Sequence, residues 1–275
     1  MENENIGLEI AKETIKEVAA DVYEDVGRPV AKPTGELVGL VPRAIKAALS
    51  PLEKWILQKE YNVAETKKML EEKLQNIPPE LIESPEPHIA VPAMQYISYC
   101  MDCDELRDMY ANLLANSMNK VVKNGVHPGF IEIIKQLCPD EAKILKYFLN
   151  HSIVPTVTLR YEDEEGSGIN FIKDFSVVGE LANCERPYEI CVYLNNLCRL
   201  GLVEYSNLAS LTNKDLYKPL KEHPYIAKKA TDSTAESFGF KKAKIVEGYV
   251  ALTDYGEAFG NVCLGDIHTE VMQES

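Results

Sequence analysis

The sequence predicts a mainly α protein, in which a helical N-terminal domain precedes a C-terminal α+β domain of the winged helix-turn-helix type. Two observations support this class. Apolar residues recur at helical spacing between Leu106 and Val122, which predicts a long amphipathic helix. From Pro139 onward, the pattern predicts a helix, a β-hairpin, two helices and two strands in that order, which is the winged-helix plan. The chain of 275 residues is long enough for both domains.

The predicted domain boundaries follow the breaks in these patterns. We expect an N-terminal helix and linker at 1–34, a helical domain at 35–137, a winged-helix-like domain at 138–265 and a disordered tail at 266–275. The wing of the second domain carries a long insertion at 207–246.

For the first half of the chain, the sequence predicts helices separated by prolines. Residues 6–26 predict a first helix, and residues 62–75 predict a charged surface helix with oppositely charged pairs four residues apart. Five prolines then fall between positions 78 and 92. Because each proline fixes its own φ and biases its predecessor toward extended backbone, we expect a helical turn at 79–82 followed by an extended strap.

Residues 35–57 are the most membrane-like stretch, and two interpretations compete for them. The favoured one is a broken core helix anchored by a tryptophan. The other is an amphipathic helix that lies on a bilayer or on a partner. On that second interpretation the contact residues are Leu37, Val41, Arg43, Lys46 and Trp55. No apolar run reaches ~18 residues, so no transmembrane helix is predicted.

A cluster of three helices is predicted in the middle of the chain. The first spans 102–124, with Asp102 and Glu105 as a capping box and Asn124-Gly125 as its stop. Two further helices begin at prolines 128 and 139, where the missing N–H costs nothing. The segment between the domains is an interdomain joint, which we expect to be largely buried and to couple the two halves. Its candidate residues are His127, Phe130, Ile134 and Leu137.

Several ordered segments resemble a known family. They are PLEKWI at 51–56, LEEKLQNIPPELIESPEPHIAVPAMQYISY at 70–99, DELRDMYANLLANSM at 104–118 and VHPGFIEIIKQLCPDEAKIL at 126–145. Together they are similar to the Abi-alpha (abortive-infection alpha) family, over roughly residues 35 to 260. The resemblance implies a bacterial protein, often carried by a prophage or plasmid, that is associated with defence against phage. It supplies no catalytic residues.

The C-terminal half alternates strand and helix signals. Residues 153–161 and 169–175 are rich in β-branched residues and flank an acidic, glycine-containing turn, which predicts a hairpin. Short helices are expected at 176–184 and 186–201, and residues 247–252 are the expected return strand. Thr253 or Asp254 caps the last helix.

A DNA-binding role would place the helix at 187–199 in the major groove. Its polar candidates are Asn195, Asn196 and Arg199, but Glu189 on the same helix is unfavourable near phosphate. The wing insertion has eight lysines against four acids, a local charge of +4, with aromatic residues interleaved. The lysines are Lys214, Lys218, Lys221, Lys228, Lys229, Lys241, Lys242 and Lys244. The favoured interpretation is a solvated loop that pairs with the acidic remainder of a chain whose net charge is −14.

The sequence predicts no catalytic, metal or cofactor site. Cys100 and Cys103 form a lone C-x-x-C pair, whereas structural zinc needs four ligands. His127 precedes a proline at a helix start and is explained as a turn residue. The seven scattered cysteines and the polar N-terminus favour reduced thiols and a cytoplasmic location.

We therefore expect a non-enzymatic bacterial anti-phage protein that acts through protein–protein contact. The expected partner is another protein, such as a phage-encoded one, or a second copy of the chain. One alternative is a winged-helix DNA-binding transcriptional regulator. A third is a membrane-acting toxin that uses residues 35–57. Nucleic acid and membrane surfaces are disfavoured as partners because of the net negative charge.

Overall fold

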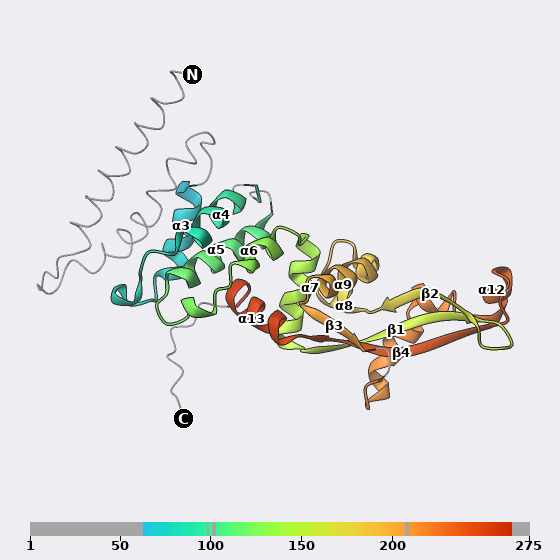
Figure 1. Cartoon of the computed structure of the whole chain (residues 1–275). Coiled ribbons are helices and arrows are strands. Elements are labelled where there is room, and N and C mark those ends of the chain that lie inside the picture. Colours follow the sequence, from blue (N-terminus) through green and yellow to red (C-terminus); the bar gives the residue numbers. More distant parts are fainter. Residues whose placement is uncertain (1–62, 98, 101–102, 207–208, 266–275) are drawn as a thin grey trace, which may run out of the picture. The chain divides into compact units, whose positions relative to one another are not determined.

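A computed structural model describes residues 63–97, 99–100, 103–206 and 209–265 of the chain (Figure 1). The chain divides into two compact units. The first comprises Met1–Tyr99, Leu113–Val126 and Ile267–Ser275, and the second comprises Cys100–Asn112 and His127–Asp266. The division falls within helix α5, Asp104–Met118.

The first unit is helical where it is described. It contains α3 (Val63–Leu74), the 3-10 turn η1 (Pro79–Leu81), α4 (Pro87–Ile97), the end of α5 and η2 (Lys123–Gly125). Its apolar side chains are buried together. A short bridge between Ile82 and Asn119 joins the segment after η1 to the end of α5. The Lys123–Glu83 ion pair lies on the same two segments.

Two local predictions in this unit are wrong. The strap expected to be extended is helical from Pro87 onward, because a proline is tolerated in the first helical position and the apolar residues of α4 are buried. The helix expected to reach residue 124 ends at Met118. Its end coincides with the buried Asn119, whose side-chain oxygen accepts the Val121 amide at 3.0 Å, a bond that competes with the helical pattern.

Part of the second unit is built from helices. They are the start of α5, α6 (Gly129–Ile134), α7 (Pro139–Asn150) and α13 (Asp254–Cys263). The Asn112 amide donates to the Cys263 carbonyl at 2.9 Å, and the Phe130 and Phe259 rings meet edge to face at 5.3 Å. The predicted start of α7 at Pro139 and the predicted cap of α13 by Thr253 are both confirmed.

The remainder of the second unit is built on a four-stranded antiparallel sheet. The strands are β1 (Ile153–Glu162), β2 (Gly168–Phe175), β3 (Val203–Ser206) and β4 (Lys242–Leu252), in the order β2-β1-β4-β3. The β1–β2 hairpin confirms the prediction made from residues 153–175. β1 pairs with β4 along its whole length, from Ile153 opposite Ala251 to Glu162 opposite Lys242.

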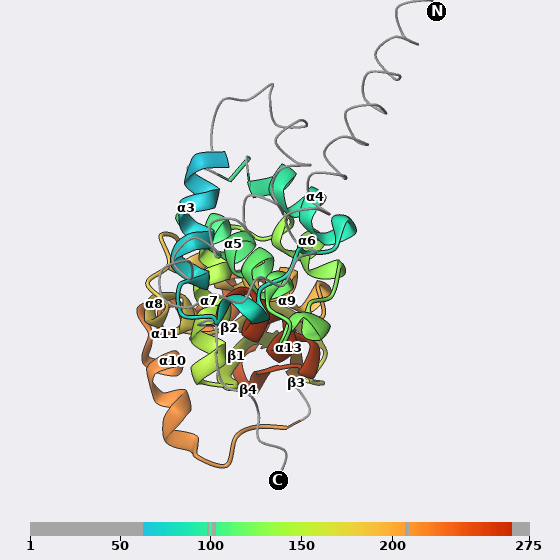
Figure 2. The same ribbon diagram turned by 90° about the vertical axis from the view of Figure 1, so that its left-hand side faces the viewer.

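Short helices pack against this sheet. α8 (Val178–Leu181), η3 (Pro187–Glu189) and α9 (Ile190–Arg199) follow β2 in sequence. α9 contacts both β2 and β3, the two edge strands. The segment between β3 and β4 folds into η4 (Lys214–Tyr217), α10 (Lys218–Glu222), α11 (Pro224–Ala227) and α12 (Asp232–Ser237). Figure 2 shows α8, α10 and α11 to the left of the strands.

The predicted fold class, mainly α with a winged-helix C-terminal domain, is wrong. The second unit is dominated by a four-stranded sheet whose two central strands have 10 and 11 residues. The expected wing insertion is a set of short helices with fully buried side chains, among them Tyr217, Leu220, Ile226 and Ala235. Half of β4 also lies in the stretch assigned to the insertion.

Some predictions fall outside the described residues. These are the N-terminal helix and linker at 1–34, the amphipathic stretch with Leu37, Val41, Arg43, Lys46 and Trp55, and the tail at 266–275. Among the residues that are described, no helix combines the length and the apolar character that crossing a bilayer requires.

Candidate interaction surface

The exposed side of η3 and α9 carries large apolar side chains. Tyr188 and Val192, one helical turn apart, are 55% and 62% exposed. The opposite side of α9 is buried through Ile190, Leu194 and Leu197. The helix is therefore apolar on two sides, of which only one faces the core.

Leu181 in α8 adds a third exposed apolar side chain, at 56% exposure. α8 packs tightly on η3, because a Cβ at Gly179 would lie 2.6 Å from the Pro187 carbonyl oxygen. The glycine thus permits the close approach of the two elements. We name the exposed pair Tyr188 and Val192 the α9 face.

Aromatic rings from α11 border the α9 face. The Tyr188 and Tyr225 rings stack with centroids 5.9 Å apart, and Tyr225 also stacks on Phe175 at 5.4 Å. The Lys229 ammonium lies 3.7 Å from the Tyr225 ring centroid, a cation–π geometry. His223 Nε2 lies 3.0 Å from the Glu180 carboxylate, which ties α11 to α8. These contacts hold the border of the face in a defined arrangement.

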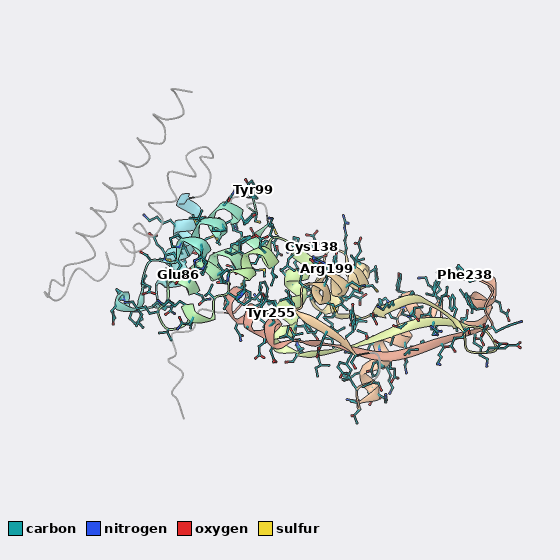
Figure 3. All side chains as sticks on the ribbon, in the orientation of Figure 1. Glu86, Tyr99, Cys138, Arg199, Phe238 and Tyr255 are labelled. Atoms are coloured by element: carbon teal, nitrogen blue, oxygen red, sulfur yellow. The ribbon has the colours of Figure 1, made fainter. Side chains whose placement is uncertain are left out.

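The polar residues predicted for DNA contact are engaged within the protein. Asn196 donates to the Gln136 carbonyl at 3.0 Å and to the Glu141 carboxylate at 2.9 Å. Arg199, labelled in Figure 3, donates to Asn196 Oδ1 and to Gln136 Oε1. The Asn195 amide donates to the Cys191 carbonyl at 2.7 Å. These bonds fix α9 to the start of α7 and leave the apolar side chains as the main feature of its exposed side.

A buried carboxylate holds the turn before α9. Asp140 accepts hydrogen bonds from the Glu185 amide at 2.9 Å, the Arg186 amide at 3.0 Å and the Tyr193 hydroxyl at 3.1 Å. Burial favours the neutral acid and is the largest single influence on its pKa. The hydrogen bonds and the nearby Lys143 together outweigh it, so the pKa of Asp140 is lowered. The ionised carboxylate is therefore part of the structure that positions the α9 face.

Most lysines of the predicted basic insertion have partners on the sheet or nearby. Lys214 and Lys221 both reach the Glu247 carboxylate, at 2.6 and 2.7 Å. Lys218 pairs with Asp215, and Lys244 with Glu162, while Lys229 lies on the Tyr225 ring. Three more, Lys228, Lys241 and Lys242, are exposed and form no recorded ion pair within the described part of the chain.

A second aromatic cluster, which is exposed only in part, lies at the end of the sheet where Figure 3 labels Phe238. Its rings are Tyr161, Phe171, Phe238 and Phe240, with Phe171 and Phe238 centroids 4.9 Å apart. Phe238 is 54% exposed and Ile169 is 47% exposed. Neither this cluster nor the α9 face was predicted as a surface. The signal for the α9 face was the four-residue spacing of Tyr188 and Val192.

The residues proposed as an interdomain joint all belong to the second unit. Phe130, Ile134 and Leu137 are buried, whereas His127 is exposed. His127 Nδ1 accepts the Gly129 amide at 3.0 Å, which matches its predicted role as a turn residue. Coupling between the two halves stays a prediction.

The cysteine and acidic residues form no metal site in the described segments, where no group of three or more His, Cys, Asp or Glu could hold an ion. All seven cysteines are free thiols. Burial, the largest effect, raises the pKa of both Cys100 and Cys103, so neither is an activated thiolate.

Comparison with known proteins gives one family match. The family model described as "Abortive infection alpha" matches residues 58–263. No curated protein matches the chain. Among solved structures, an uncharacterised protein from the hydrocarbon-degrading marine bacterium Alcanivorax borkumensis SK2 is 21% identical, with a TM-score of 0.35. The match covers 48% of this chain and 90% of that one.

Proposed function

Because the chain belongs to the abortive infection alpha family, we propose that it acts in defence against phage by binding another protein through the α9 face. The observation that carries the proposal is the exposure of Tyr188 and Val192, which are one helical turn apart and each more than half accessible. Large exposed apolar side chains on the same side of a helix are typical of protein–protein contact sites. Tyrosine is also enriched among the residues that contribute most to binding.

The chemistry of this face favours a protein over nucleic acid. A groove-binding helix needs cations for phosphates and base edges. Here Arg186 lies 3.6 Å from Glu189, and Arg199 donates to Asn196 and Gln136. The net charge of −14 adds a repulsive long-range field. An apolar surface with a polar border suits a protein partner of complementary shape.

The proposal assigns no catalytic residue and no cofactor, because on this proposal the protein acts by binding its partner and not by a chemical reaction. We propose a cytoplasmic location, which the seven free thiols support. A robust hydrolase or nuclease activity of the purified protein would contradict the non-enzymatic part of the proposal.

A protection assay tests the role of the α9 face. Cells that express the wild type, Val192→Asp or Tyr188→Ala are challenged with a panel of phages, and plating efficiency and cell survival are measured. We expect the two variants to lose protection while their thermal unfolding stays close to that of the wild type, because both side chains are largely exposed.

Ile169→Asp is the matched control, since Ile169 is a similarly exposed apolar residue at the far end of the sheet. It should protect as the wild type does. Full protection by Val192→Asp and Tyr188→Ala would refute the assignment of the surface. Equal loss in Ile169→Asp would show that the effect is not specific to the α9 face.

A further inference from the structure

Asp174 occupies an irregular position near the end of β2. The β1–β2 register shifts between Val157 and Leu159, opposite this residue. Its φ is 53°, in the left-handed region, where aspartate is tolerated better than most residues. Thr158 on β1 fixes this conformation, because its hydroxyl accepts the Asp174 amide at 3.0 Å and donates to Asp174 Oδ1 at 3.2 Å. The irregularity turns the carboxyl group inward rather than toward solvent.

The inward carboxyl group is fully buried and incompletely paired. Asp174 is 0% exposed. Its Oδ2 atom has no hydrogen-bond partner among the described residues. The Lys173 ammonium is 3.6 Å from Oδ2, beyond hydrogen-bond distance, and its side chain is half exposed. The buried Tyr205 hydroxyl on β3 also has no partner in the described chain. Unsatisfied buried polar groups are rare and require an explanation.

α9 lies over this polar cluster. The helix contacts both β2 and β3, the strands that carry Asp174 and Tyr205, and its Cys191 thiol is near enough for the charge of Asp174 to act on it. The groups that face Asp174 are thus Lys173 from β2, the Thr158 hydroxyl from β1, Tyr205 from β3 and Cys191 from α9. Lys173, whose ammonium also lies 5.7 Å from the Tyr205 ring, is the single cation of this set.

The electrostatics of the cluster favour the neutral acid. Burial raises the pKa of Asp174, and the attraction of Lys173 and the Thr158 hydrogen bond lower it only in part. Burial, followed by the charge of Asp174, raises the pKa of Tyr205 and raises that of Cys191 to about 11. Tyr205 and Cys191 therefore stay neutral, and Lys173 is the cation of this set that faces an ionised Asp174.

We propose that Asp174 is a pH-dependent switch that controls how tightly α9 packs against β2 and β3. With a proton, the carboxyl group is neutral and can remain under the helix. Without the proton, a charge is buried beside a single half-exposed lysine. Separation of α9 from the edge strands would hydrate that charge. The switch concerns the protein alone and does not depend on the identity of any partner.

The direction of the pH dependence follows from the raised pKa of Asp174. A carboxyl group whose pKa is higher in the closed state favours closure when it is protonated. The stabilisation is complete below its ordinary value of 3.8 and is lost as the pH rises through the raised pKa. Packing of α9 should therefore loosen with rising pH over this interval.

Hydrogen–deuterium exchange of the full chain tests the switch. Amide protection of residues 190–199 is measured between pH 4 and pH 8, with exchange times scaled for the intrinsic pH dependence. We expect protection to fall as the pH rises in the wild type. In Asp174→Asn, which keeps the shape without the charge, protection should stay at the low-pH level. Protection in the wild type that does not change with pH would overturn the proposal, as would the same pH dependence in Asp174→Asn.

A second variant decides the question even if Asp174→Asn does not fold. Lys173→Met removes the cation that lowers the pKa of Asp174 and keeps an unbranched side chain at a position that is half exposed. The midpoint of the protection change should shift to higher pH. An unchanged midpoint, or a shift to lower pH, would contradict the proposed role of Asp174. Asp163→Asn, in the hairpin turn between β1 and β2, is the matched control and should leave the midpoint where it is in the wild type.

Discussion

Replacement of Asp140 by asparagine tests whether this carboxylate holds the turn that precedes α9. The two carboxylate oxygens receive the amides of Glu185 and Arg186 and the hydroxyl of Tyr193, all within 3.1 Å. Asparagine has almost the same shape, but it offers one acceptor oxygen in place of two. Its NH₂ group must then face at least one of the three donors.

The expected cost follows from these contacts. Hydrogen bonds to a charged group contribute about 1.5–3 kcal/mol each, and an unmatched buried polar group costs about 1–3 kcal/mol. Glu185 and Arg186 are exposed residues, so water can replace part of what their amides lose. Tyr193 is only 7% exposed and cannot be compensated in this way. We therefore expect Asp140→Asn to lower the free energy of unfolding by about 3 kcal/mol at pH 7.

The same substitution has a predicted pH dependence. The folded-state pKa of Asp140 is lower than its ordinary value of 3.8. A lowered carboxyl pKa stabilises the fold above the ordinary value, and this contribution is lost as the pH falls through the folded pKa. The difference between wild type and Asp140→Asn should hence be constant from pH 7 to about pH 5 and narrow toward pH 3.

Urea denaturation followed by circular dichroism at pH 7 and pH 3 measures both quantities. Asp215→Asn is a suitable control, because Asp215 forms an exposed ion pair with Lys218 and little change is expected. A difference for Asp140→Asn of less than about 1 kcal/mol at pH 7 would refute the reasoning. So would a difference that is as large at pH 3 as at pH 7.

Two further predictions concern the attachment of the insertion and the packing of α13. Glu247→Gln should increase the rate of tryptic cleavage between residues 209 and 241 several-fold at neutral pH, because the hydrogen bonds of Lys214 and Lys221 that lower the pKa of Glu247 lose their charged acceptor. An unchanged digestion time course would contradict the anchoring role of that pair. Gly256→Ala should reduce stability in thermal denaturation by about 2 kcal/mol or more, because its Cβ would lie 2.0 Å from the Leu202 carbonyl oxygen. Gly125→Ala, where nothing lies within 4 Å of the new Cβ, should have little effect.

Elements with strong local signals could be predicted from the sequence. The β1–β2 hairpin has two β-branched runs around a glycine-containing turn, and the turn is stabilised by Asp163, which accepts the Glu165 and Ser167 amides. The cap of α13 depends on a threonine hydroxyl three residues from its amide partner. In each case the residues that decide the structure are neighbours in the chain, so their pattern is visible without tertiary information.

Elements stabilised by distant contacts could not be predicted. The first half of β4 alternates lysine with small or apolar residues, and it becomes a strand because Lys242 pairs opposite Glu162 of β1, eighty positions earlier. Strand preference depends strongly on such neighbours. The insertion contains helices because its buried residues reach the sheet, as the Tyr217 hydroxyl does by donating to the Gly248 carbonyl at 2.9 Å. Contacts between such distant residues are not visible in the local sequence pattern, and the predicted fold class was wrong for this reason.

The α9 face could have been predicted from the sequence. At about 100° per residue, Val192 lies about 200° from Ile190, whereas Leu194 and Leu197 lie within about 40° of it. Val192 therefore belongs to the side opposite the core stripe, together with Tyr188. The angular positions of the apolar residues thus distinguish this second side from the core stripe.

The lysines of the insertion show why charge counted along a segment differs from charge present on a surface. Residues 207–246 have a net charge of +4, but three of their lysines pair with acids on strands outside that range. Glu247 of β4 receives Lys214 and Lys221, and Glu162 of β1 receives Lys244. The pairing of β1 with β4 brings both acids beside the insertion. Because a partly buried ion pair has little external field, the positive charge available to a phosphate is smaller than the composition indicates.

Glu247→Gln would free two lysines, so this variant should bind a DNA duplex more tightly at low salt than the wild type does, as a gel-shift titration can measure. Equal binding by the two proteins would show that the acids on the strands do not limit the charge of the insertion.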